Sequence, residues 1–200
     1  MKNVNVLLKD YHVRFSYIKE DTSKMEAISK EVDSGEAVNL DLLKMCVKNR
    51  HFDFLHLRRE EKIPFVNRIA QKLLDEGVLD KKYVDFESLY QEVERLIGSE
   101  KNVGLLMLYD ISRMIGYALQ PQVLPKDFVY LQSGAKIGAK RLLGLNRLGR
   151  KLPVEVFKRF FPNEDSQHIE DILCIYKDAF KDGVFIPKSK KCGMKSNRRC

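Results

Sequence analysis

The chain has 200 residues and a mass of 23.3 kDa, enough to bury a hydrophobic core as one domain or two small ones. Hydrophobic residues make up 44% and charged residues 32%, which excludes a membrane-embedded protein and a disordered chain. The chain contains 36 lysines and arginines against 28 aspartates and glutamates, so its formal net charge is +8 and its pI about 9.2. This charge favours an anionic partner, nucleic acid first.

The basic charge is concentrated in two parts of the sequence. Residues 188–200 hold six basic and no acidic residues, and residues 126–159 hold nine basic against two acidic ones. Residues 188–200 lack apolar periodicity, which predicts a flexible basic tail, either a phosphate-binding arm or a solubilising end. The charges of residues 126–159 lie among core-type residues and therefore predict a structured basic surface.

Apolar residues recur at helical spacing along most of the chain, so we predict a mainly α fold, a multi-helix globular bundle. Strand alternation is confined to two doubtful pieces, Val4 to Leu8 and Asp127 to Leu131. The predicted helices run from Thr22 or Ser23 to Val32, from Asn39 as cap towards Leu55, from Pro64 to Glu76, from the Asp85 cap to Ile97, from Gly104 to Leu119, from Gly134 to Leu143, from Pro153 to Phe161 and from Asp165 to Lys181, closed by Gly183.

The helix over residues 104–119 is apolar on nearly every side, which predicts that it is the central buried helix of the core. Its residues Asp110, Arg113 and Tyr117 fall on one stripe. Buried between helices, these three would form a polar cluster. Exposed, they would form an ordinary solvated face, which is the interpretation we favour.

No linker rich in Ser, Gly or Pro divides residues 1–187. We therefore expect a single helical domain, with possible lobes at 1–97 and 98–187, followed by the basic tail at 188–200. The apolar run near the N-terminus is too short for a signal peptide, and no stretch is long enough to span a membrane. These features predict a cytoplasmic protein without a membrane partner, and they leave its oligomeric state open.

The four cysteines, Cys46, Cys174, Cys192 and Cys200, lack the close spacing of a zinc module. His168 could be combined with Cys174, Cys192 and Cys200 in a metal site, but nothing in their spacing requires one. We therefore interpret the four cysteines as free intracellular thiols. No metal and no cofactor are expected. The group His51, Asp53 and His56 is interpreted as ordinary polar residues, because its spacing does not place both histidines on one helical face.

One turn has the most specific pattern in the chain: Gly98-Ser99-Glu100-Lys101-Asn102-Val103-Gly104 joins two apolar helices. Over about residues 86–119 the sequence resembles the helix-hairpin-helix superfamily of DNA-binding proteins, whose hairpin usually reads Gly-apolar-Gly. The hairpin here reads Asn102-Val103-Gly104, and Asn tolerates the left-handed conformation better than other non-glycine residues. The alternative is a tight corner between two helices that binds nothing.

The resemblance implies a phosphate contact made by the turn amides and the N-terminus of the following helix. Val103 would anchor the turn in the core, and Lys101 would add salt-dependent affinity. Such a contact positions a protein on a duplex without reading its sequence.

The segment Ser133 to Arg141 is rich in glycine, alanine and basic residues but is not a P-loop. Gly134 and Gly138 would allow either close packing on another helix or the approach of a phosphate. The basic surface predicted to contact phosphates consists of Lys136, Lys140, Arg141, Arg147, Arg150 and Lys151.

Some helix-hairpin-helix proteins are base-excision DNA glycosylases, so the resemblance also implies a possible catalytic carboxylate, Asp127. It lies 23 positions after Gly104, near where that family places its aspartate. The match is incomplete, because Leu106 stands where bifunctional members carry a lysine and the iron–sulfur loop is missing. Asp127 could instead cap a short helix.

The leading interpretation is a protein that binds DNA without sequence specificity, with duplex DNA favoured over RNA, and that is then not an enzyme. A glycosylase-like enzyme using Asp127 is the first alternative. A helical module that binds RNA or an acidic protein is the second.

Overall fold

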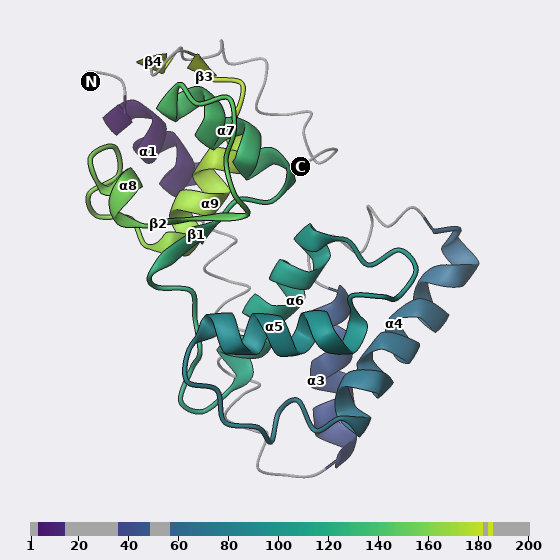
Figure 1. Cartoon of the computed structure of the whole chain (residues 1–200). Helices are drawn as coiled ribbons and strands as arrows, with labels where there is room; N and C mark the ends of the chain where they lie inside the picture. Colours follow the sequence, from purple (N-terminus) through teal and green to yellow (C-terminus); the bar gives the residue numbers. More distant parts are fainter. Residues whose placement is uncertain (1–3, 15–35, 49–56, 182–183, 186–200) are drawn as a thin grey trace. The chain divides into compact units, whose positions relative to one another are not determined.

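The computed structural model describes residues 4–14, 36–48, 57–181 and 184–185, and it confirms the mainly α fold (Figure 1). The chain divides into two compact units, which we call the middle unit, Ile18–Leu124, and the terminal unit, Met1–Tyr17 with Pro125–Cys200. The division therefore follows residue 124, whereas the sequence suggested possible lobes that met after residue 97. The terminal unit is therefore built from segments that precede and follow the middle unit in the sequence.

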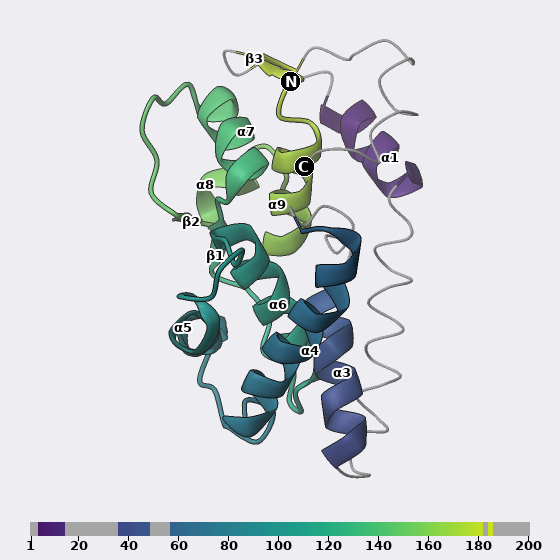
Figure 2. The same ribbon diagram turned by 90° about the vertical axis from the view of Figure 1, so that its right-hand side faces the viewer.

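The described part of the middle unit is a bundle of helices. Its elements are α3 (Glu36–Lys48), α4 (Arg59–Asp75), α5 (Phe86–Ile97) and α6 (Leu105–Ala118). Helix α6 packs against α3 and α5, and α4 also packs against α3 and α5 (Figure 2). Because most side chains of α6 are buried, the prediction of a central hydrophobic helix over about residues 104–119 is confirmed.

Capping residues predicted from the sequence define two helix ends in this unit. The Asp85 side chain accepts a hydrogen bond of 2.8 Å from the amide of Ser88 and begins α5. Gly77 follows α4 with a φ of 63°, the left-handed conformation that glycine adopts without strain. Gly104 is the N-cap of α6, within one residue of the predicted start.

The prediction that Asp110 and Arg113 lie on a solvated face is wrong. The structure exposes only 2% of Asp110 and 7% of Arg113, because α3 and α5 both pack against α6. The two charged groups lie 4.0 Å apart, and the Arg113 guanidinium lies 5.8 Å from the centre of the Tyr109 ring. Pairing and a cation–π contact reduce the cost of burying these charges.

The terminal unit combines helices with short antiparallel pairs of strands. Its described elements are α1 (Val4–Arg14), β1 (Phe128–Tyr130), α7 (Ser133–Leu143), β2 (Lys151–Pro153), α8 (Glu155–Lys158), α9 (Ser166–Ile175), β3 (Phe180–Lys181) and β4 (Val184–Phe185). Strand β1 pairs with β2 and β3 with β4. Helix α9 packs against both α7 and β1.

The secondary structure predicted for the N-terminal segment and for the region around Pro153 is wrong. Residues Val4 to Leu8, read as a doubtful strand, belong to helix α1, whose buried residues Val4, Leu7 and Tyr11 follow helical spacing. Pro153 ends strand β2 instead of beginning a helix, and only the short helix α8 follows. Pairing of Val129 with Leu152 explains this difference, since tertiary pairing overrides local propensity.

Three other helix boundaries differ from their predictions. Helix α3 begins before Asn39. Helix α4 begins at Arg59, after its N-cap Arg58, whose amide donates to the Glu61 carboxylate at 3.0 Å, so Pro64 lies inside the helix. Helix α9 begins after its predicted cap Asp165 but ends at Ile175. Outside the described residues lie the predicted helix up to Val32, the polar group His51, Asp53 and His56, Gly183, Cys192, Cys200 and the basic tail.

Glycines allow α7 to approach α9 closely. A Cβ atom added to Gly138 would lie 2.0 Å from the carbonyl oxygen of Leu173, and one added to Gly134 would lie 2.7 Å from Sγ of Cys174. Neither distance is compatible with a side chain. The packing explanation of these two glycines is therefore confirmed, and both residues are buried.

We expect Gly138→Ala to lower the free energy of unfolding by about 2 kcal/mol, because its methyl group would force α7 away from the backbone of α9. Thermal unfolding would measure the change. Gly149→Ala is the matched control, since its Cβ would make an ordinary contact of 3.6 Å. Equal melting temperatures for the two variants would contradict the packing explanation.

Candidate nucleic-acid interface

The turn between α5 and α6 contains a residue in the left-handed conformation at the position where the hairpin usually has its first glycine. Asn102 has a φ of 73°, so the residue that stands in place of the usual glycine adopts the left-handed conformation. The amide of Val103 donates to the carbonyl of Glu100 at 3.1 Å, and the amide of Glu100 donates to that of Ile97 at 3.0 Å. Lys101, Asn102 and Gly104 are exposed. The turn is thus ordered and accessible.

Val103 is only half-buried, so it anchors the turn less deeply than predicted. Gly104 begins α6 without a side-chain cap, and a Cβ atom added there would meet no atom within 4 Å. The start of α6 therefore offers open space beside backbone donors, as a phosphate contact requires.

Glu100 binds the hairpin turn to α4. Its carboxylate accepts hydrogen bonds from the Arg68 guanidinium and, at 2.8 Å, from Nζ of Lys72. These two bonds, led by that of Lys72, hold the pKa of Glu100 below its ordinary value. The ion pairs fix the turn, and they also place a negative charge beside Lys101.

Glu92 on α5 also accepts hydrogen bonds from one lysine and one arginine, as Glu100 does, but at a different place in the middle unit. Its carboxylate accepts hydrogen bonds from Arg95 at 2.8 Å and from Lys81 at 2.5 Å, and these lower the pKa of Glu92 to about 2. Both carboxylates are 18% exposed. The two clusters therefore differ mainly in position, because only Glu100 lies on the turn.

We expect Glu92→Gln to lower the melting temperature at neutral pH and to have no effect near pH 2. Since folding lowers the pKa of Glu92 from 4.5 to about 2, its ion pairs stabilise the fold above pH 4.5 and stop doing so as the pH falls to about 2. The exposure of Lys81 and Arg95 limits the effect to about 1 kcal/mol or less. Melting curves across this range would measure it. A difference in melting temperature between Glu92→Gln and the wild-type protein that does not change with pH would contradict this role of the ionised Glu92 carboxylate.

The exposed side of α7 presents basic side chains that have no ion-pair partner among the described residues. Lys136 and Lys140 lie one helical turn apart and are partly exposed, and Arg147 is exposed in the following loop. The opposite side of the helix carries Gly134 and Gly138 against α9. Half of the predicted basic surface is therefore available to an anion.

The other three residues of the predicted basic surface make contacts within the terminal unit. Arg141 donates to Asp178 at 2.7 Å and to the carbonyl of Lys177 at 2.8 Å. The Nζ atom of Lys151 lies 4.5 Å from the centre of the Phe128 ring. The backbone carbonyl of Arg150 accepts a hydrogen bond from the amide of Leu131. The side chain of Arg150 is exposed.

The hairpin and the basic surface belong to different units. Residues 98–104 lie in the middle unit, whereas residues 136–151 lie in the terminal unit. Asp127 is also in the terminal unit, where it directly precedes β1 and its carbonyl accepts a hydrogen bond of 2.9 Å from the amide of Val154. Its side chain is exposed. It precedes a strand and caps none of the described helices.

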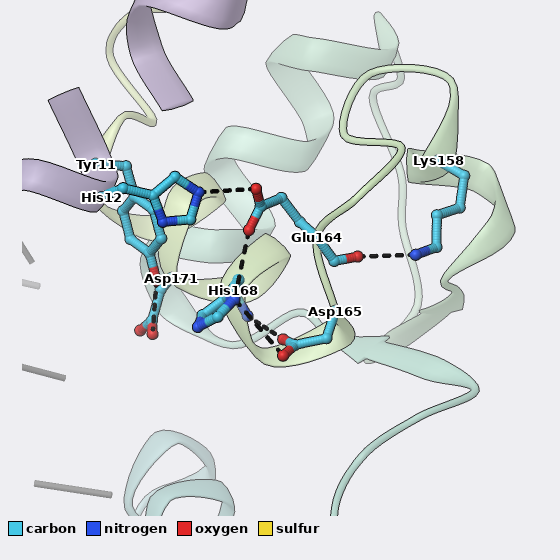
Figure 3. Close-up of polar contacts among 7 residues, drawn as sticks. All are labelled: Tyr11, His12, Lys158, Glu164, Asp165, His168 and Asp171. Carbon is cyan, nitrogen blue, oxygen red and sulfur yellow. Dashed lines mark hydrogen bonds and ion pairs between the residues drawn. The ribbon is translucent and has the colours of Figure 1, made fainter. Parts of the chain in front are cut away.

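Sequence reasoning missed a cluster of polar side chains that attaches α1 to α9 (Figure 3). Each oxygen of the buried Glu164 carboxylate meets a histidine, His12 at 2.9 Å and His168 at 3.4 Å. Tyr11 donates to Asp171 at 3.5 Å, and its ring contacts both imidazoles edge-on. The cluster holds the N-terminal helix in the terminal unit.

The sequence signals this cluster only through its charge, because residues 160–187 hold six acidic against two basic residues. Asp10 adds a second link, because it accepts a hydrogen bond of 2.7 Å from the Tyr176 hydroxyl. Since these partners are 152 to 166 positions apart, local patterns cannot pair them.

We expect Glu164→Ala to free α1, because it removes the carboxylate shared by His12 and His168. The cost should be about 1–3 kcal/mol, typical of a lost buried hydrogen-bond partner. Hydrogen exchange measured by mass spectrometry should become faster in α1, with α4 and α5 as internal controls. Unchanged exchange in α1 would contradict a holding role for the cluster.

Cys46 and Cys174 are buried free thiols, as predicted, and burial raises the pKa of Cys46 to about 12. Within the described residues no group of three His, Cys, Asp or Glu side chains is arranged to hold a metal ion. None of the described helices combines the length and apolarity needed to cross a membrane.

Comparisons with protein-family models, curated proteins and solved structures found no match to this chain.

Proposed function

We propose that the protein binds nucleic acid through backbone phosphates, with duplex DNA favoured over RNA. The observation that carries the proposal is the exposed side of α7, where Lys136, Lys140 and the following Arg147 have no ion-pair partner within the described residues. Cations that are not neutralised by the protein bind phosphates and release counterions from the nucleic acid. Lys136, Lys140 and Arg147 follow one another along one helix and the loop after it, so they can bind successive phosphates of a polyanion.

The hairpin supports the same proposal independently. Its left-handed Asn102, the uncapped start of α6 and the exposed Lys101 form a turn at which backbone amides and a cation are available to one phosphate. Contacts of this kind fix the position of a duplex without reading bases. The proposed binding is therefore sequence-nonspecific, and the glycosylase alternative gains no support from the exposed Asp127.

We expect the triple variant Lys136→Gln, Lys140→Gln and Arg147→Gln to weaken duplex DNA binding roughly a hundredfold at about 0.1 M salt. The slope of log K against log salt concentration should become less steep by about 2.7, since each lost phosphate contact contributes about 0.9. Fluorescence anisotropy of a labelled duplex, measured at several salt concentrations, would determine both values.

The matched control removes the same charge from three exposed positions of the middle unit, Lys48→Gln, Arg59→Gln and Lys82→Gln. It should have a much smaller effect on affinity and slope. Absence of binding by the wild-type protein at low salt would overturn the proposal. Equal or tighter binding of RNA would favour the RNA-interaction alternative over duplex DNA.

A further inference from the structure

Two cationic side chains of α4 meet the Glu100 carboxylate in the hairpin turn. Arg68 donates from Nη1 to one carboxylate oxygen and Lys72 donates from Nζ to the other. The side chains of Arg68 and Lys72 are 52% and 40% exposed, whereas that of Glu100 is 18% exposed. Lys101 follows directly in the chain and is exposed. Three cations are thus gathered around one turn.

Carboxylates and phosphates bind the same donors. A guanidinium group binds either anion through paired hydrogen bonds, and an ammonium group binds either as a point charge. An oxyanion group already lies between Arg68 and Lys72, held by both of them. The exposure of the two cations means that a phosphate from solvent can reach them.

We propose that Glu100 occupies a phosphate-binding position of the hairpin, formed by Arg68, Lys72 and Lys101, and thereby limits the affinity of this protein for nucleic acid. A backbone phosphate that binds there takes the place of the carboxylate. The inference rests on the proposed function and adds to it a second set of phosphate ligands and a residue that regulates them.

Glu92 shows that the bonding of Glu100 alone does not define this site. It accepts hydrogen bonds from one lysine and one arginine, as Glu100 does, but lies within helix α5. Glu100 instead lies on a turn that contains a left-handed residue and leads to an uncapped helix start with open space beside Gly104. The position on the hairpin distinguishes an anion site from a structural ion pair.

The test compares Glu100→Gln with Glu92→Gln in the full-length protein. Each substitution raises the net charge by one and removes a carboxylate shared by one lysine and one arginine, so general electrostatic attraction increases equally. Arg95 keeps an ion pair of 3.5 Å with Glu76 after Glu92→Gln. We expect Glu100→Gln to tighten binding of a labelled DNA duplex by about tenfold and to steepen the salt slope by about 1–2, as one or two new phosphate contacts would. Glu92→Gln should change affinity no more than about twofold.

A thermodynamic cycle identifies the cations involved. Adding Arg68→Gln and Lys72→Gln to Glu100→Gln should remove the whole gain in affinity. The same pair of substitutions in the wild-type background should have a small effect, because Glu100 already occupies both side chains. Melting temperatures of all variants would confirm that they are folded.

The possible results separate the inference from the proposed function. Equal effects of Glu100→Gln and Glu92→Gln on a wild-type protein that binds DNA would overturn the inference and leave the proposed function standing. Binding by Glu100→Gln but not by the wild-type protein would support the inference and overturn the proposed function of the wild-type protein. Absence of binding by both proteins at low salt would overturn both proposals.

Discussion

The close contact between α7 and α9 determines which side chains the terminal unit presents to solvent. At Gly138 the two backbones lie so close that no Cβ atom fits between the helix and the carbonyl of Leu173. This contact fixes the rotation of α7 about its own axis. Lys136 and Lys140 consequently lie away from α9, and Gly134, Ala135 and Ala139 lie in the core. A small-residue stripe and a basic stripe on one helix are therefore two results of one packing constraint.

In the middle unit, α6 has the corresponding role. It is covered by both α3 and α5, so even its charged residues Asp110 and Arg113 are buried. The hairpin before α6 is consequently attached to the best-packed helix of the unit. Glu100 adds a connection to α4 through Arg68 and Lys72. A turn held from both sides keeps its amides in place, which reduces the entropic cost of binding an anion.

The sequence allowed good predictions where the signal is local. Asp85 as a cap, Gly77 after a helix and the continuous apolar character of α6 all act within a few residues, and all three predictions are confirmed. Predictions failed where distant segments decide the conformation. Pairing with Val129 makes the segment before Pro153 a strand, and contacts in the core make the segment after Val4 a helix.

The candidate site shows the same limit. The left-handed Asn102 could be predicted, because the preference belongs to that residue. The ion pairs Arg141–Asp178 and Arg68–Glu100 could not, because each joins residues more than thirty positions apart. For this reason the sequence overestimated the number of available cations on the basic surface. It also gave no indication that the hairpin and this surface belong to different units.

The packing of α1 against residues that follow the middle unit has a consequence for synthesis on the ribosome. The middle unit is continuous in sequence and can complete its core as soon as residue 124 has emerged. Helix α1 is made before its partners Glu164 and Asp171, which follow His12 and Tyr11 by 152 and 160 positions. Its apolar residues Leu7 and Tyr11, which are buried in the folded protein, therefore lack their final neighbours until those residues have been made. Helix α1 can therefore make these contacts only after residue 171 has been made, when the sequence of the middle unit is already complete.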